Sequence, residues 1–112
     1  METVSKKIIF QGSALSDLRA FPVSARREAG FQLDRIQAGK EPDDWKPMAT
    51  VGYGVQEIRI RDSAGAFRVI YVVKFESAIY VLHCFQKKTQ KTSRRDLELA
   101  TQRMKDLMKE LK

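Results

Sequence analysis

The 112-residue sequence predicts an α+β fold with an amino-terminal helical hairpin, an antiparallel β-sheet meander and a carboxyl-terminal amphipathic helix. Three observations support this prediction. Apolar residues recur at helical spacing before residue 40, alternate with charged residues between residues 55 and 85, and return to helical spacing after residue 93. The length suits one modest hydrophobic core, so we expect a single domain over residues 1–112.

The amino-terminal part combines a short apolar segment with two helical segments. The sequence KIIF, residues 7–10, suits a first strand. A short serine-capped helix is expected in SALSDLRAF, and Pro22 suits the first turn of a second helix. Gly39 is expected to end that helix. Residues 40–54 contain two prolines and two glycines, which predict a loop.

Three alternating segments predict the meander. They are VQEIRIRD, FRVIYVVKF and IYVLHCF, and the turns DSAGA and ESA separate them. If Ile60 faces Phe67 across the first turn, the isoleucines of the first segment share one apolar face. The opposite face then carries a charged set: Glu57, Arg59, Arg61 and Arg68. Adjacent arginines repel one another, so an anion or an acidic partner is expected there.

The carboxyl-terminal segment predicts an amphipathic helix from about residue 94 to residue 111. Ser93 and Asp96 resemble a capping box. The apolar stripe comprises Leu97, Ala100, Met104, Leu107, Met108 and Leu111. We expect this stripe to pack on the sheet. The alternative is a detachable helix that exposes a groove for a partner.

The net charge of +7 is concentrated in one part of the chain. Residues 59–95 hold nine basic and two acidic side chains, whereas the remaining residues hold 12 of each. A localised excess of this kind is typical of a surface that binds nucleic acid or another anionic partner. The alternative is a protein that is merely basic, because charge alone identifies no partner.

Several other classes of protein are not supported by the sequence. One His and one Cys cannot supply the usual zinc ligands, and no glycine-rich phosphate loop is present, so no metal and no cofactor are expected. No apolar run approaches the length of a transmembrane helix, so we expect a cytoplasmic protein without a membrane partner. Cys84 lies in the most apolar segment and is expected to be a buried, reduced thiol.

Metal-free RNA cleavage fits the residue types that remain. The 2′-hydroxyl of RNA attacks the adjacent phosphate, so the protein must supply a base, an acid and cations that stabilise the phosphorane. Residues of suitable types are Glu57, Arg59, Arg68, His83 and Lys87. His83 has the ordinary pKa closest to neutrality, and a lysine whose pKa is lowered by neighbouring cations can carry a proton.

Each of these residues also has an ordinary structural explanation. His83 could be a hydrogen-bonded residue of an apolar strand. Glu57 could be the salt-bridge partner of a neighbouring arginine. Lys87, Lys88 and Lys91 could form only a solvated loop.

Three motifs in order, GVQEIR, FRVIY and HCFQKKTQKT, resemble the RelE/ParE superfamily of bacterial toxins. The similarity is greatest to its HigB-like branch, which includes phage-derived proteins, and it covers roughly residues 43–110. It implies a type II toxin, an endoribonuclease (mRNA interferase) that cleaves mRNA on the ribosome. It also implies an antitoxin encoded beside it, usually of the helix-turn-helix type, with an acidic contact surface. Two departures are Glu57, where some family nucleases have lysine, and the absence of proline between Thr92 and Ser93.

The resemblance and the residue types together define the expected site. The expected catalytic residues are Arg59, Arg68, His83 and Lys87, with Glu57 as a candidate base. The residues expected to bind RNA are Arg61, Lys88, Lys91 and Arg94. The alternatives are a non-enzymatic toxin or regulator that binds a protein such as gyrase, as the ParE branch does, and a degenerate toxin that only binds partners.

Overall fold

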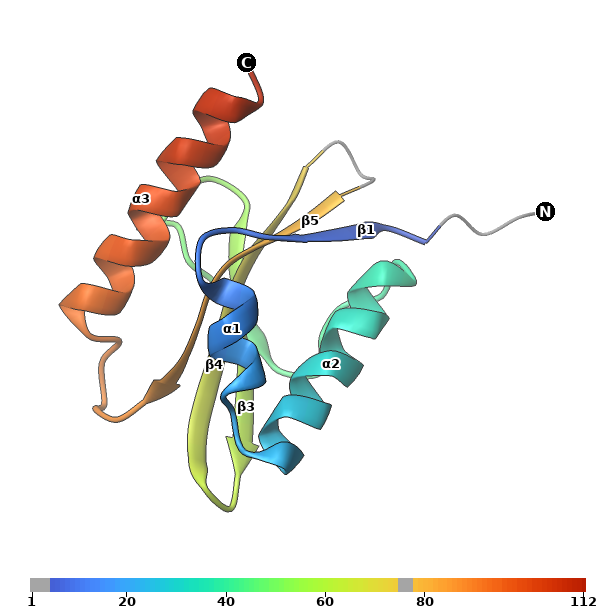
Figure 1. Cartoon of the computed structure of the whole chain (residues 1–112), viewed down its shortest axis with the longest axis vertical. Coiled ribbons are helices and arrows are strands. Elements are labelled where there is room, and N and C mark those ends of the chain that lie inside the picture. Colours follow the sequence, from blue (N-terminus) through green and yellow to red (C-terminus); the bar gives the residue numbers. More distant parts are fainter. Residues whose placement is uncertain (1–4, 75–77) are drawn as a thin grey trace.

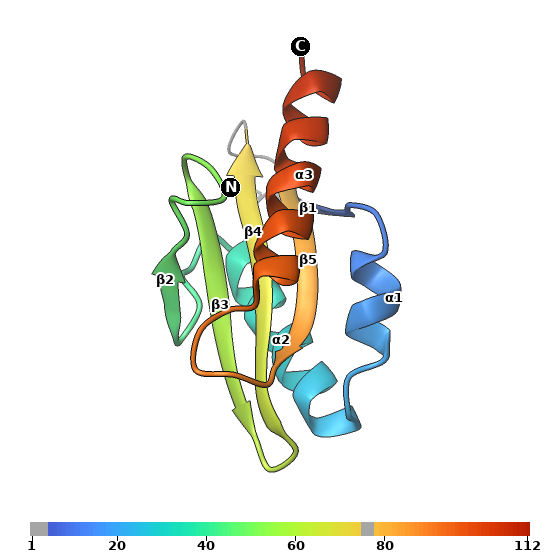
Figure 2. The ribbon, with the colours of Figure 1, turned by 90° about the vertical axis from the view of Figure 1, so that its left-hand side faces the viewer.

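The polypeptide forms a five-stranded sheet with helices on both faces (Figure 1 and Figure 2). The computed structural model describes residues 5–74 and 78–112. In chain order, the elements are β1 (Lys7–Phe10), α1 (Ala14–Arg19), α2 (Val23–Gln37), β2 (Trp45–Pro47), β3 (Val55–Asp62), β4 (Gly65–Lys74), β5 (Ala78–Lys87) and α3 (Arg94–Glu110). The predicted α+β class, with a helical hairpin, a meander and a final helix, is confirmed.

The strands lie in the order β1-β5-β4-β3-β2. β3, β4 and β5 are antiparallel neighbours, and Ile60 lies opposite Phe67 as predicted. β1 pairs in parallel with only the first part of β5, Ala78 to Val81. The predicted end of the second segment at Phe75 and most of the predicted turn ESA lie outside the described residues.

Alternation along the strands divides the hydrophobic core between the two faces of the sheet. One cluster packs against α1 and α2; its members include Leu18, Leu33, Ile58, Ile60, Phe67, Val69 and Val81. The other cluster packs against α3; its members include Val55, Ile70, Val72, Leu82, Ala100, Met104 and Leu107. The helices therefore pack on opposite faces of the sheet: α1 and α2 on one face and α3 on the other.

The ends of α2 follow the expected local signals. Pro22 immediately precedes the helix with a φ of −52°, which is close to the helical value that its ring imposes. Gly39 follows the helix with a φ of +81°, a value that side chains with a Cβ rarely adopt. The predicted stop at Gly39 is confirmed, whereas Pro22, with a ψ of 150°, lies just before the first helical turn and not within it.

α3 has the predicted cap and most of the predicted packing. The backbone N–H of Asp96 donates to Oγ of Ser93 at 3.1 Å. The stripe prediction is wrong for Met108, which is 44% exposed. Successive helical residues point about 100° apart, so Met108 turns away from the sheet when Leu107 packs on it. Among the described residues, no helix is both long and apolar enough to cross a membrane.

The prediction of a loop over residues 40–54 is wrong for Trp45–Pro47. These residues form β2, which pairs antiparallel with Gln56 to Ile58 at the edge of the sheet. An edge strand tolerates proline because the missing N–H need not join a second neighbour. This pairing places Lys46 opposite Glu57.

Candidate nucleic-acid interface

α3 covers only one end of its face of the sheet, and basic side chains gather at the other end. In Figure 2, α3 lies over β4 and β5 but leaves the end near the β3–β4 turn open. Cross-strand pairs at this end place Arg59 opposite Arg68, Arg61 opposite Ala66, and Ala66 opposite Lys87. Residues that lie opposite each other on neighbouring strands point to the same face of the sheet, so these basic side chains lie together on one face. We call Lys46, Arg59, Arg61, Arg68 and Lys87 the cationic face.

The loop that follows β5 lies on the same side of the sheet. Figure 2 shows residues 88–93 crossing in front of the sheet before α3 begins. A hollow of about 160 Å³ between this loop and β5 is lined in part by Lys87 and Lys88. Lys91 and Arg94 are exposed farther along, and Arg94 forms an ion pair with Glu98 at 3.1 Å. Lys88 is thus the predicted loop residue closest to the cationic face along the chain.

Glu57 and Arg68 form a buried ion pair within this face. Glu57 is 0% exposed and Arg68 is 5% exposed, and Nε of Arg68 lies 3.5 Å from Oε1 of Glu57. Nη1 of Arg68 donates to the carbonyl oxygen of Phe67 at 3.0 Å. Both carboxylate oxygens and Nε have no hydrogen-bond partner among the described residues. The pair is therefore held by charge, and each partner compensates a desolvated charge that would otherwise be unpaired.

The surroundings of Lys87 disfavour the charged form of its side chain. Burial lowers the pKa of Lys87, and the nearby charges of Arg68, Lys46 and Arg59 lower it further, against an opposing effect of Glu57. Burial also lowers the pKa of Arg68, which Glu57 opposes. A guanidinium stays protonated even so, whereas a lysine with a lowered pKa has a more accessible neutral form.

His83 is directed into a hydrogen-bond network and away from solvent. The side chain is 4% exposed, and its ring stacks on Phe85 with a centroid distance of 5.0 Å. Nε2 lies 2.7 Å from Oδ1 of Asp96, and Nδ1 lies 3.3 Å from Nη1 of Arg103. A guanidinium can only donate, so Nδ1 is the acceptor and Nε2 donates its proton to the carboxylate. Both ring nitrogens are thus occupied by protein groups.

Arg103 extends this network to the amino-terminal part of the chain. It donates to the carbonyl oxygen of Leu82 at 2.9 Å and to Oγ of Ser13 at 2.9 Å. The network therefore joins α1, β5 and α3, and this arrangement favours the structural explanation of His83. Sequence reasoning identified Asp96 only as a capping residue and did not identify Arg103. A basic residue on the polar side of an amphipathic helix carries no local signal of a long-range contact.

Metal chemistry has no evident site in the part of the chain that the structure describes. Within residues 5–74 and 78–112, no group of three or more His, Cys, Asp or Glu side chains could hold a metal ion. Cys84 is buried, and its burial raises the pKa of the thiol to about 12. This thiol is therefore protonated and unreactive at neutral pH.

The fold is that of the RelE toxins. The structure of the free E. coli toxin RelE, in a double arginine-to-alanine mutant, matches with a TM-score of 0.64 and 16% identity, over 92% of this chain and 98% of that one. A chain of the toxin–antitoxin complex RelBE2 from Mycobacterium tuberculosis matches with a TM-score of 0.53 and 19% identity, over 79% of this chain and 98% of that one.

The sequence defines the family more closely. Residues 16–105 match the family described as phage derived protein Gp49-like, and the chain belongs to this family. Among curated proteins, none is significantly similar in sequence. The matched residues include all of the cationic face and, from the network, His83, Asp96 and Arg103, but not Ser13.

Removing one partner of the buried ion pair should destabilise the fold more than removing both. Arg68→Leu leaves the Glu57 carboxylate buried without a cation, so we expect a loss of about 3–5 kcal/mol in the free energy of unfolding. The double variant Glu57→Leu/Arg68→Leu should recover most of this loss. Urea denaturation measures both values. Arg61→Leu is the exposed control, and equal losses in the single and double variants would contradict the proposed role of the pair.

Removing a neighbouring charge should raise the pKa of Lys87. Lys46 is exposed and lies on the same face, so Lys46→Gln removes a repulsive charge without opening the core. Titration of the Lys87 ammonium by NMR should show the upward shift. Lys40→Gln, a substitution away from the cationic face, serves as the control. The same Lys87 pKa in both variants would show that Lys46 does not act on it.

Proposed function

We propose that this chain is the toxin of a type II toxin–antitoxin module, of the HigB-like branch, and that it cleaves mRNA on the ribosome without a metal ion. The observation that carries the proposal is the cationic face. Five basic side chains from four neighbouring strands share an end of the sheet that α3 leaves open. Repulsion among them is relieved when a phosphate backbone binds, so the face suits RNA.

The cations have distinct roles in the proposed reaction. Arg59 and Arg61 bind the phosphates on either side of the cleaved bond, because a planar guanidinium can donate to two phosphate oxygens at once. Arg68 is buried beside them and contributes its positive charge as the phosphorane forms. Lys88, Lys91 and Arg94 hold the RNA strand where it passes the loop. The ion pair with Glu98 makes Arg94 the weakest of these three contacts.

Lys87 is the proposed proton carrier. In its neutral form it accepts the proton of the 2′-hydroxyl as the 2′-oxygen bonds to phosphorus and the bond to the 5′-oxygen breaks. The 5′-oxygen takes up a proton from water, so a 2′,3′-cyclic phosphate and a 5′-hydroxyl result. The lowered pKa of Lys87 supports this role, because it brings the neutral form closer to the working pH.

Glu57 and His83 act indirectly in this proposal. Glu57 is fully buried and acts on the face by holding Arg68 in place. His83 holds the first turn of α3 against β5 through Asp96, and so positions the loop that carries Lys88 and Lys91. Both residues are positioning residues, not groups that contact the RNA.

The proposed partner is an antitoxin encoded beside the toxin gene. The solved RelBE2 structure is a toxin–antitoxin complex, and its chain shares the fold described here. An acidic contact surface on the antitoxin would complement the net charge of +7. A helix-turn-helix domain on that antitoxin is the form expected for the HigB-like branch.

Lys87→Arg tests whether Lys87 carries a proton or only a charge. Arginine keeps the positive charge but does not deprotonate, so we expect RNA cleavage to fall by about 10²–10⁴-fold while ribosome binding persists. Growth arrest on expression and primer extension on cellular mRNA measure the effect. Lys40→Arg, a substitution away from the cationic face, is the matched control.

Three outcomes distinguish the alternatives. Discrete new 5′ ends within translated codons, lost in Lys87→Arg, support the proposed reaction. Cleavage by Lys87→Arg at the wild-type rate rules out Lys87 as the proton carrier. Intact transcripts together with DNA damage would instead indicate a toxin that acts on gyrase.

A further inference from the structure

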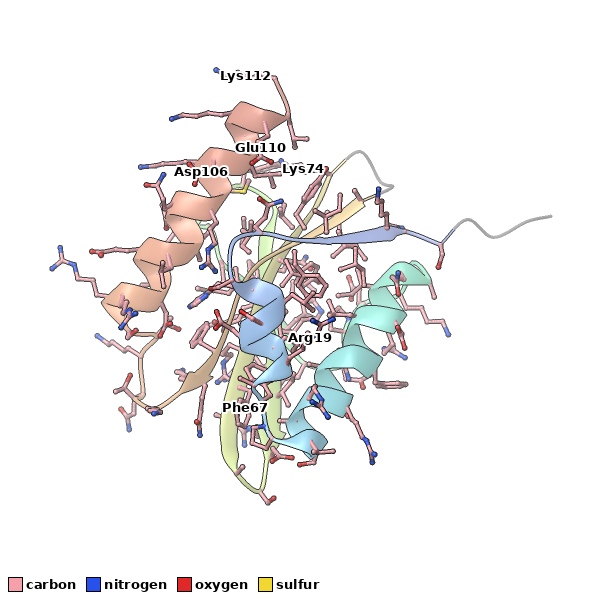
Figure 3. The ribbon with its side chains drawn as sticks, viewed as in Figure 1. Arg19, Phe67, Lys74, Asp106, Glu110 and Lys112 are labelled. Atoms are coloured by element: carbon pink, nitrogen blue, oxygen red, sulfur yellow. The ribbon has the colours of Figure 1, made fainter. Side chains whose placement is uncertain are left out.

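A second surface lies at the far end of the molecule from the cationic face. It is a groove of about 500 Å³ between α3, the end of β4 and the turn before β3. We call this the α3 groove, and its lining is Gly52, Tyr53, Lys74, Met104, Lys105, Met108, Lys109 and Lys112. In Figure 3, Lys74 and Lys112 lie at the end of the molecule where α3 finishes, whereas Phe67 lies toward the other end of β4.

Apolar side chains of the α3 groove remain exposed to solvent. Tyr53 is 93% exposed and Met108 is 44% exposed, and these are two of the large apolar residues that the fold does not bury. Met104 is buried and forms part of the groove lining. Methionine adapts its shape to different partners, and an aromatic ring contributes a large contact area. A groove of this size and composition suits the apolar side chains of a partner.

The charges around the α3 groove all have one sign. Lys105, Lys109 and Lys112 are spaced so that they follow one side of α3, and Lys74 approaches from β4. No acidic residue occurs in the lining among the described residues. Asp106 and Glu110 belong to α3 but not to the groove lining. The partner that complements this surface is apolar at its centre and acidic at its borders.

A purely structural explanation accounts for only part of this surface. Lysines in the last turns of a helix interact favourably with the negative end of the helix dipole. That interaction explains Lys109 and Lys112, but it explains neither the exposed Tyr53 nor the exposed Met108. The coincidence of apolar lining and basic border therefore indicates a docking surface.

We infer that the α3 groove binds an acidic amphipathic helix of the antitoxin, an inference that rests on the proposed function. Such a helix presents apolar side chains three and four residues apart, with Asp or Glu beside them. Its apolar side chains would enter between Met108 and Tyr53. Its carboxylates would meet the lysines of α3 on one side and Lys74 on the other.

The position of the α3 groove separates two tasks of the antitoxin. A helix bound there anchors the antitoxin at the end of α3, away from Arg59, Arg61 and Lys87. Blocking of RNA then requires another part of the antitoxin, or its bulk, to reach the cationic face. Variants of the α3 groove should therefore change antitoxin affinity without changing RNA cleavage.

Charge reversal in the α3 groove tests this inference. The wild-type chain and Lys105→Glu/Lys109→Glu are each titrated with the purified product of the reading frame beside the toxin gene. We expect the groove variant to bind about 10–100-fold more weakly, because close charge pairs become repulsive. It should still arrest growth, and co-expressed antitoxin should no longer rescue the cells. Circular dichroism and thermal unfolding confirm that the variant is folded.

Two further variants sharpen the result. Lys88→Glu/Lys91→Glu reverses the same number of charges in the loop, and it should weaken ribosome binding while leaving antitoxin affinity within about twofold. Tyr53→Ala changes no charge, and it should weaken antitoxin binding about 10-fold or more if the ring is a central contact.

The outcomes separate this inference from the proposed function. Antitoxin affinity that stays within about twofold in both groove variants overturns the inference. The inference is also overturned if Lys105→Glu/Lys109→Glu loses ribosome binding and keeps antitoxin binding. The groove would then be a contact surface for the ribosome. A wild-type chain that neither arrests growth nor binds the neighbouring gene product instead overturns the proposed function, and the identity of the partner with it.

Discussion

The packing of α3 against one end of the sheet is the interaction on which the rest of the structure depends. Ala100, Met104 and Leu107 are buried against the sheet, and the network of Asp96, His83 and Arg103 fixes the same helix to β5 and α1. Because α3 does not reach the β3–β4 turn, the end of the sheet face near this turn remains open (Figure 2). The docking position of α3 thus separates the polar, open part of that face from the apolar part that the helix covers.

Burial of charge next to the open face gives the site its electrostatic character. Arg68 is desolvated and paired with Glu57, so its charge is fixed in position and weakly screened. That fixed charge acts on Lys87 from the neighbouring strand, and Lys46 and Arg59 add to it. A pair that costs desolvation energy on folding thereby keeps a positive potential where a phosphate would bind. The same ion pair therefore affects both the charge distribution of the cationic face and the stability of the fold.

The sequence predicts those features that depend on local pattern. The alternation of Ile58 and Ile60 with Arg59 and Arg61 determined the strand faces, and the short turn determined the register of β3 and β4. The Ser93–Asp96 cap and the Gly39 stop were predicted because capping needs only neighbouring residues. Three members of the cationic face, Arg59, Arg61 and Arg68, follow from this register alone. The chemistry of this face could therefore be anticipated before any tertiary contact was known.

Features that depend on distant contacts could not be predicted in the same way. β2 escaped detection because Trp45–Pro47 pairs only at an edge, where composition resembles that of a loop. The burial of Glu57 depends on strands β2 and β4. The sequence alone therefore did not decide whether Glu57 is a base or the salt-bridge partner of an arginine. Met108 was assigned to the packed stripe because a sequence pattern does not say where a helix leaves the sheet. That exposed methionine is what reveals the α3 groove.

The terminal chemistry of cleaved mRNA tests the central claim most directly. Purified chain is added to translating ribosomes, and the ends of the mRNA fragments are identified by mass spectrometry and by their reactivity toward phosphatase and kinase. Attack by the 2′-hydroxyl predicts a 2′,3′-cyclic phosphate, or the phosphate that its hydrolysis leaves, upstream of a 5′-hydroxyl. Fragments with a 3′-hydroxyl and a 5′-phosphate, or no fragments at all, would contradict the account.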